Sequence, residues 1–294
     1  MEWTHLVLSG GGGVGMVYLG ALYALRAKLM ALTSIHGTSV GAVVGAMLCL
    51  GVDWDALLRF VVECPWDILL TPTRDQLDTA YFRGGVFDES TMLRVMRPLL
   101  GAVSLPPTCT LAQLHAHSRI SLHIVAFDIN SFTPLVISHV THPDLSLITA
   151  LAMSCAIPGL VAPIFLGDQC CIDGGVTSAN NPIHQCLASL SGASADAPAD
   201  VAVLNLRVES EPRLSAVLPG AQCVDMAWVF TCNALAHIAR PTPISYDDAR
   251  RVTTLICLTP EDPMAPATLS TLATTPAARA AWIEYGKSQA VLAF

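Results

Sequence analysis

The stretch THLVLSGGGGVGM, residues 4–16, predicts the fold class of this chain. Its apolar run Leu6–Ser9 is typical of a short buried strand, and the glycines that follow end that strand. Gly15–Leu29 has the apolar spacing of a helix. Thr33–His36 and Ser39–Leu50 then repeat the order of strand and helix. Two such units in succession predict parallel strands joined by crossover helices.

The rest of the chain continues this α/β pattern. Further helices are expected at Trp54–Val62, Ser90–Leu100, Leu145–Ser154, Gln222–Ala239 and Ala277–Leu292. Further strands are expected at Ser121–Phe127, Leu135–Val140, Ile164–Leu166, Gln169–Ile172, Val201–Val208 and Val252–Leu258. A polar region, Thr71–Asp88, and a small-residue loop, Ser191–Asp200, have no clear period. We expect one α/β domain over residues 1–294, with three layers: a mainly parallel sheet and helices on both of its faces.

Composition and charge narrow the possible partners. The 294 residues are 53% hydrophobic and 13% charged, which is enough apolar material for a sizeable core. The net charge of -8 argues against nucleic acid and against electrostatic attachment to anionic membranes. Any lipid contact is therefore expected to be mainly apolar.

The cysteines and histidines do not indicate a disulfide framework or a metal site. The ten cysteines include no CxxC pair and mostly lie in apolar runs, so buried free thiols in a reducing compartment are expected. His115 with His117, or His139 with His142, could pair on a metal, but no third ligand is evident. We expect no metal and no cofactor.

No segment of the sequence predicts export or membrane insertion. No secretory signal is visible near Glu2. Leu145–Gly167 is long enough to span a bilayer and uncharged, but Pro158, Gly159 and Pro163 interrupt it. A cytoplasmic protein with transient membrane contact is therefore expected.

The glycine run has three interpretations. Gly10–Gly15 matches the GxGxxG pattern of a dinucleotide site, but no acidic residue lies between Glu2 and Asp53 to hold a ribose, and no Gly-Lys-Ser/Thr of a P-loop follows. No nucleotide is therefore expected. A tight turn without a ligand is the simplest alternative. In the third interpretation, the consecutive glycines turn backbone N–H groups toward one point and form an oxyanion hole at a helix N-terminus.

The pentapeptide GTSVG, residues 37–41, fits the pattern GxSxG of a serine nucleophile on a sharp turn between strand and helix. Ser39 follows the second predicted strand, so it is expected at the same sheet edge as the glycine run. A serine nucleophile needs a base, and neither His184 nor His237 has a distinctive setting. Asp173, at the end of an apolar strand and before Gly174-Gly175, is the better candidate, although Asp-Gly is also common in ordinary turns.

Taken together, these residues resemble the patatin-like phospholipase family. Four blocks carry the resemblance in order: Ser9–Gly15 with Leu19-Gly20, then Gly37–Gly41, then Ser154–Gly159, then Asp173–Gly175 followed by Asn180-Asn181-Pro182. The matching motifs are confined to residues 6–182, and the last third of the chain has none.

The resemblance implies a lipid acyl hydrolase with a Ser–Asp dyad, no histidine and no cofactor. In that reading Ser39 attacks the ester carbonyl of a lipid or phospholipid and Asp173 activates it. The region Gly11–Gly13 holds the oxyanion, and Ile157–Gly159 shapes the site.

One departure from the family pattern leaves an alternative open. Val14 stands where the family usually has lysine or arginine, which would help to hold the loop or an anionic substrate. This favours neutral lipids or simple esters as substrates. It also leaves open a catalytically weak lipid-binding or regulatory protein. Thr71–Asp88, with Tyr81 and Phe82, is a lid candidate whose simpler interpretation is a surface loop.

Overall fold

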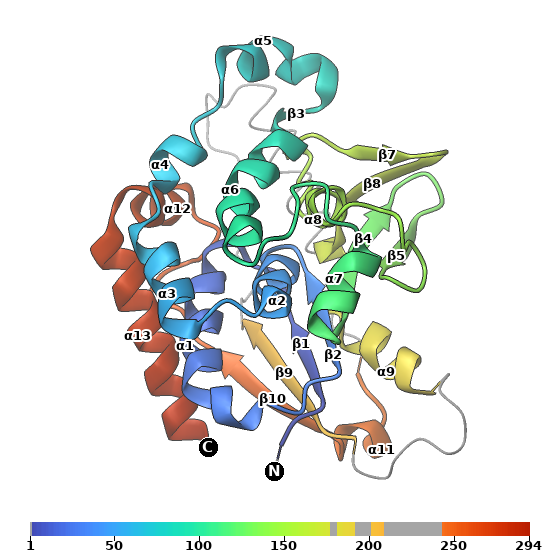
Figure 1. Ribbon diagram of the computed structural model, residues 1–294, viewed down its shortest axis with the longest axis vertical. Coiled ribbons are helices and arrows are strands. Elements are labelled where there is room, and N and C mark those ends of the chain that lie inside the picture. Colours follow the sequence, from blue (N-terminus) through green and yellow to red (C-terminus); the bar gives the residue numbers. More distant parts are fainter. Residues whose placement is uncertain (1, 177–180, 192–200, 209–242) are drawn as a thin grey trace, which may run out of the picture.

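A mixed β-sheet with helices on both faces forms the centre of the molecule (Figure 1). The computed structural model describes residues 2–176, 181–191, 201–208 and 243–294. The strands of the main sheet are β1 (His5–Leu8), β2 (Ser34–Thr38), β4 (Ser121–Asp128), β5 (Thr133–Ile137), β7 (Ile164–Leu166), β8 (Gln169–Asp173), β9 (Val203–Val208) and β10 (Val252–Cys257). They are arranged in the order β10-β9-β1-β2-β4-β8-β7, and β5 also pairs with β4.

The parallel part of the sheet confirms the predicted fold class. β10, β9, β1, β2 and β4 are parallel, while β5, β7 and β8 are antiparallel to their neighbours. A small second sheet pairs β3 (Gly85–Phe87) with β6 (Gly159–Val161) in parallel. β7 and β8, close to the two short strands expected at Ile164–Leu166 and Gln169–Ile172, pair as an antiparallel hairpin.

The helices cover both faces of the sheet (Figure 1). They are α1 (Gly15–Leu25), α2 (Val40–Leu50), α3 (Trp54–Glu63), α4 (Trp66–Leu69), α5 (Arg74–Arg83), α6 (Glu89–Ala102), α7 (Leu111–Ser118), α8 (Leu147–Ser154), α9 (Ile183–Ser191), α11 (Tyr246–Ala249), α12 (Pro266–Thr274) and α13 (Pro276–Ala293). The helix expected at Gln222–Ala239 and the loop expected at 192–200 lie outside the described residues.

The absence of a period in Thr71–Asp88 was misleading, because the region holds a helix. α5 begins with a capping box, in which the Thr73 side chain accepts from the Gln76 N–H and the Gln76 side chain accepts from the Thr73 N–H. α7 was also not predicted, and it begins with the same device at Thr110 and Gln113. Both helices therefore begin with a capping box, and α7 also buries Leu111 and Leu114 in the main core cluster.

The core lies on both sides of the sheet. Leu6 and Leu8 of β1 belong to a large cluster that includes residues of α1 and α2, whereas Val7 packs with Ile183 and Leu187 of α9 on the other face. On the first side, α13 packs closely on α1. A Cβ on Gly20 would run into the Ile283 carbonyl, so this close helix contact requires glycine there.

The described cysteines confirm the expectation of free thiols. All eight are free; seven are buried and Cys155 is half-buried. Within the described part of the chain, we find no helix both long enough and apolar enough to cross a membrane.

Candidate active site

The register of three strands brings Ser39 and Asp173 together. β4 lies between β2 and β8. Thr38 pairs with Val125 of β4, and Asp173 pairs with the next β4 residue, Ala126. Ser39 follows Thr38, so it lies level with Ala126 and opposite Asp173. β8 is antiparallel and pairs only with Ala126–Asp128, the last residues of β4, so its final residue, Asp173, still lies near the carboxyl ends of the parallel strands.

Ser39 lies on a strained turn between β2 and α2. Its φ of 53° and ψ of -127° are rare for a residue other than glycine. A Cβ on Gly37 would lie 2.5 Å from the Ala42 Cα, and a Cβ on Gly41 would run into the Leu8 carbonyl oxygen. Glycines on both sides of Ser39 are therefore needed for the tight turn that the GxSxG pattern predicted.

A second serine holds this turn in place. The Ser39 N–H donates to the Ser154 Oγ at 2.9 Å, and the Ser154 hydroxyl donates to the Val125 carbonyl at 2.6 Å. Two residues further on, the Ala156 carbonyl accepts from the Asp173 N–H at 3.0 Å. The segment 154–156 thus fixes the backbone of both Ser39 and Asp173. The sequence block Ser154–Gly159 pointed to this segment but not to these contacts.

The Asp173 carboxyl is buried and only partly satisfied. Its Oδ1 accepts from the Gly175 N–H at 2.7 Å, whereas Oδ2 has no hydrogen-bond partner of regular geometry among the described residues. Burial raises the pKa of Asp173 to about 6, although the neighbouring Ser39 hydroxyl and the Gly175 N–H lower it. Asp173 is therefore a carboxyl that can change its protonation state near neutral pH.

A thiol also lies at this site. The Ser39 hydroxyl interacts with the Cys155 side chain. Burial raises the pKa of Cys155 far above its usual range, and the Asp173 carboxylate raises it further. The thiol therefore stays protonated and is a poor nucleophile.

The glycine run supplies N–H groups near Ser39, but not all three that were predicted. Gly11 and Gly12 have φ values of 136° and 54°, which only glycine adopts easily. The Gly13 N–H donates to the Pro263 carbonyl at 3.0 Å, so it is already occupied. Among the described residues, the N–H groups of Gly11 and Gly12 have no such partner. These two remain the candidate oxyanion donors.

The Val14 side chain is completely buried and belongs to the main core cluster. A Cβ on Gly11 would lie 3.1 Å from a methyl carbon of Val14 and 3.2 Å from one of Val208, so Val14 packs beneath the loop. An arginine introduced at this position would have to enter the apolar core, which is costly for a charge.

The remaining motif residues have structural contacts. The Asn181 side chain donates to the Asn205 Oδ1 at 2.9 Å and accepts from the Ile183 N–H at 3.0 Å, while Asn180 is outside the described residues. His115 stacks on His139, with ring centroids 3.7 Å apart. Among the described residues, no group of three or more His, Cys, Asp or Glu side chains is placed to hold a metal ion.

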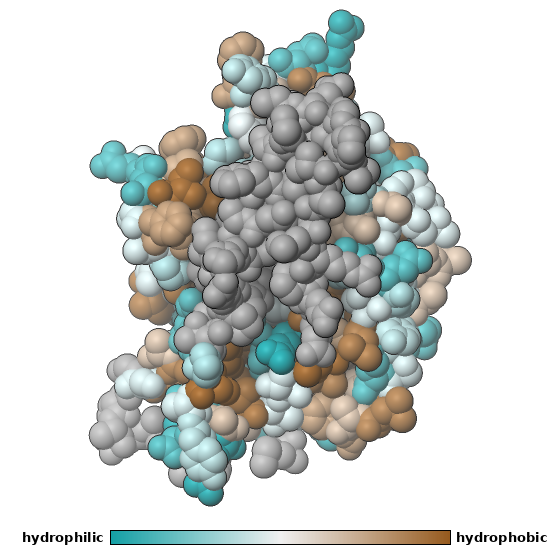
Figure 2. Space-filling model, turned by 180° about the vertical axis from the view of Figure 1, so that it is seen from behind, coloured by the Kyte–Doolittle hydropathy of each residue, from teal (hydrophilic) through white to brown (hydrophobic). Residues whose placement is uncertain are grey.

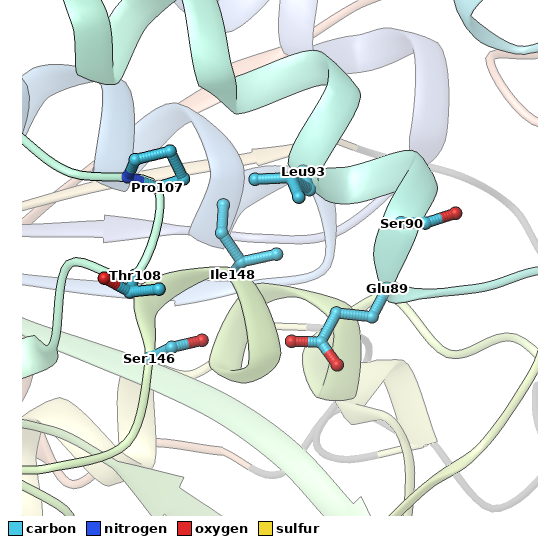
Figure 3. A pocket seen from close by; sticks show the side chains of 7 residues that line it. All are labelled: Glu89, Ser90, Leu93, Pro107, Thr108, Ser146 and Ile148. Carbon is cyan, nitrogen blue, oxygen red and sulfur yellow. The ribbon is translucent and has the colours of Figure 1, made fainter.

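A separate cavity of about 310 Å³ lies between the beginnings of α6 and α8 (Figure 3). Its lining residues are Glu89, Ser90, Leu93, Pro107, Thr108, Ser146 and Ile148. The Glu89 carboxylate accepts from the Thr149 hydroxyl at 2.5 Å. α8 separates this cavity from Ser154 by about 10 Å of helix rise. Neither Ser39 nor Asp173 lines it.

Comparisons with known proteins find lipid hydrolases among the proteins similar to this chain. The probable lipid hydrolase 463L of Invertebrate iridescent virus 6 is 28% identical over 183 residues, which are 62% of each chain. Triacylglycerol lipase ptl2 of Schizosaccharomyces pombe is 27% identical over 166 residues, covering 55% of this chain and 25% of that protein. The chain spans about six-tenths of the length of the first curated relatives it matches.

A solved structure is similar over almost the whole chain. VipD from Legionella pneumophila gives a TM-score of 0.51 at 16% identity, covering 99% of this chain and 66% of that one, a likeness of fold alone. The model of the family described as patatin-like phospholipase matches residues 6–187, a range that contains the glycine run, Ser39 and Asp173. Since this match covers more than half of the chain, the protein belongs to the patatin-like phospholipase family.

Proposed function

We propose that this protein is a serine hydrolase that cleaves acyl esters of lipids through a dyad of Ser39 and Asp173. The observation that carries the proposal is a serine on a strained strand-to-helix turn beside a buried carboxyl, whose Oδ2 has no hydrogen-bond partner of regular geometry in the described part of the chain. Family membership and the names of the lipase relatives support lipid esters as substrates.

The chemistry needs only groups that the site holds. The Asp173 carboxylate accepts the proton of Ser39, whose Oγ forms a bond to the ester carbonyl carbon. The N–H groups of Gly11 and Gly12 stabilise the negative oxygen of the tetrahedral intermediate. The leaving alcohol takes the proton from Asp173, and an acyl group remains on Ser39. Water, deprotonated by the same carboxylate, then releases the fatty acid and restores Ser39.

Neutral acyl esters are the substrates we favour over strongly anionic phospholipids. Val14 packs in the core and replaces the lysine or arginine that the family usually has at this position. The glycine run therefore offers backbone N–H donors but no basic side chain at position 14. Phospholipase A activity on a zwitterionic lipid uses the same dyad. A panel of triacylglycerol, phosphatidylcholine and an anionic phospholipid separates these substrate classes.

A second candidate function is lipid binding without efficient turnover. The observation that favours it is also Val14, because a missing cation weakens the hold on an anionic substrate. Val14→Arg is a poor test, since the side chain at this position is fully buried. Turnover by the native chain decides instead: lipid binding with no ester hydrolysis that depends on Ser39 would favour this candidate.

The two functions are separated by one set of variants. Ser39→Ala and Asp173→Asn are each compared with a matched exposed control, Ser288→Ala and Asp168→Asn. Loss of ester hydrolysis in the first pair alone supports the dyad. Full activity of a folded Ser39→Ala or Asp173→Asn protein would rule out the dyad assignment.

A further inference from the structure

α5 is a surface helix whose buried side is polar. Gln76 is its one buried residue. The Gln76 Nε2 donates to the Asp88 Oδ1 at 3.0 Å and to the Thr91 Oγ1 at 3.2 Å. Surface helices normally direct apolar residues to the core and polar residues to water. α5 does the reverse, because its attachment to the protein is made by hydrogen bonds.

The outer side of α5 carries three exposed apolar side chains among charged ones. Tyr81 and Phe82 are 91% and 86% exposed, and their rings form an edge-on pair with centroids 5.4 Å apart. Leu77, one turn before Tyr81, is 55% exposed. Single exposed apolar residues are common on protein surfaces, but two adjacent aromatic rings with a leucine on one helix side are an apolar patch that indicates a partner.

The helix holds this patch in a fixed position. The capping box of Thr73 and Gln76 fixes its beginning. Near its end, the Arg83 guanidinium forms an ion pair with the Asp88 carboxylate at 2.6 Å. Because both ends are held, the aromatic side chains are presented without the cost of ordering a loop.

The patch is linked directly to the candidate active site. α5 leads into β3, which pairs with β6: the Gly159 N–H donates to the Gly84 carbonyl at 3.0 Å and the Ala162 N–H to the Phe87 carbonyl at 2.8 Å. β6 begins three residues after Ala156, whose carbonyl holds Asp173. In Figure 1 the carboxyl ends of the parallel strands face the end of the molecule that carries α5, opposite the chain termini.

The charge of α5 indicates the kind of surface it fits. The helix carries two arginines and two aspartates, so its formal charge is zero, and Arg74 pairs with Asp78 at 3.7 Å. Hydrophilic and hydrophobic residues lie side by side at the same end of the molecule (Figure 2). A neutral helix with exposed aromatic rings fits the interface of an uncharged or zwitterionic lipid layer better than an anionic one.

We propose that Leu77, Tyr81 and Phe82 of α5 form a docking surface for a neutral or zwitterionic lipid layer, at the end of the molecule where the Ser39 site lies. The aromatic rings enter the apolar boundary of the layer, and the ion-paired charges remain among the headgroups. The delivery of substrate to Ser39 rests on the proposed function, but binding to lipid does not.

Vesicle binding tests the proposal without catalysis. Sedimentation with phosphatidylcholine vesicles is measured for the full chain carrying Ser39→Ala, with and without Y81S/F82S. Removing both rings is expected to lower the partition coefficient by about tenfold or more, with little dependence on salt. The matched control is V291S/L292S, which removes two exposed apolar side chains, 71% and 87% exposed, at the far end of the molecule.

The outcomes separate docking from catalysis. Three results would each overturn the docking surface. The first is equal partition of the Y81S/F82S protein and its parent, and the second is an equal loss of partition in both double variants. The third is self-association through Tyr81 and Phe82 in place of vesicle binding. Hydrolysis of a water-soluble short-chain ester, measured with Ser39 present, is expected to stay within about twofold in Y81S/F82S. Vesicle binding that depends on the rings, in a chain that hydrolyses no ester, would support docking and reject the proposed hydrolase.

Discussion

The hydroxyl of Ser39 lies beside the carboxyl of Asp173. These residues lie at the ends of β2 and β8, two strands that do not pair with each other. The two residues flank the strand β4, and the segment 154–156 fixes the backbone of each. The geometry therefore depends on register and on a few hydrogen bonds, both of which can be tested by substitution.

The pKa of Asp173, raised to about 6 by burial, predicts the pH dependence of activity. The base form is the carboxylate, so kcat/KM should fall about tenfold per pH unit below pH 6 and level off above it. Asp173→Asn should lower kcat by about 10²- to 10⁴-fold. The Asp168→Asn control should keep the native profile. A native profile with no inflection between pH 5 and 7 would contradict the role of Asp173.

Ser154→Ala removes the acceptor of the Ser39 N–H and the donor to the Val125 carbonyl. Because both groups are buried, we expect a loss of about 1–3 kcal/mol in the free energy of unfolding. We also expect a lower kcat with a smaller change in KM, since the position of the nucleophile is disturbed. Urea denaturation and steady-state kinetics measure these effects. An unchanged kcat would mean that the turn holds Ser39 without this contact.

Gly41→Ala and Gly101→Ala should have opposite effects. A Cβ at Gly41 would run into the Leu8 carbonyl oxygen, so this variant should lose stability and the position of Ser39. Gly101 lies in α6 with nothing within 4 Å of its added Cβ, so alanine should stabilise the protein by up to about 1 kcal/mol. Thermal unfolding of the pair is the measurement. Equal stability of the two variants would contradict the close contact at Gly41.

The alternation of strand and helix over the first 50 residues predicted the elements that carry the glycine run and Ser39. The first strand is mostly apolar, and glycines lie at or just after the end of each strand. Asp173 was a candidate base from its place at a strand end, and the family resemblance implied its dyad with Ser39. The two residues come close only through the antiparallel pairing of β8 with β4. No local pattern encodes that long-range pairing.

Two other features could not be predicted for physical reasons. Whether the Gly13 N–H is free depends on Pro263, which is distant in sequence and carries no motif. The helix α5 has polar residues inside and apolar residues outside, so its hydrophobic pattern indicated a loop. Its capping box, Thr73 to Gln76, was the one local signal for a helix.

A stacked pair of histidines, one buried and one half-buried, predicts sensitivity to acid. His36 and His123 are opposite each other on β2 and β4, and their rings stack with centroids 4.2 Å apart. Burial, together with the charges of neighbouring histidines, lowers the pKa of His36 well below 6.5 and that of His123 to about 4. Since the unfolded chain binds these protons more readily, the free energy of unfolding should fall as the pH drops from about 6.5 towards 4.

His123→Gln tests this expectation. It should reduce the slope of the free energy of unfolding against pH by the equivalent of about one proton taken up on unfolding. Asp173 acts in the opposite direction over the same range, because its raised pKa costs stability as the pH rises from 3.8 to about 6. The comparison is therefore made in chains that carry Asp173→Asn, with the half-buried His142→Gln as control. An identical slope in His123→Gln and the control would show that the stacked histidines do not cause the acid sensitivity.

Covalent labelling by a fluorophosphonate tests the central claim most directly, because this probe reports an activated serine without any assumption about the lipid. The native chain and the Ser288→Ala control should be labelled at one residue, Ser39, and Ser39→Ala should not be labelled. Asp173→Asn should be labelled far more slowly than Asp168→Asn. A folded native chain that resists the probe, or that is labelled equally after Ser39→Ala, would contradict the assignment of Ser39 as the nucleophile.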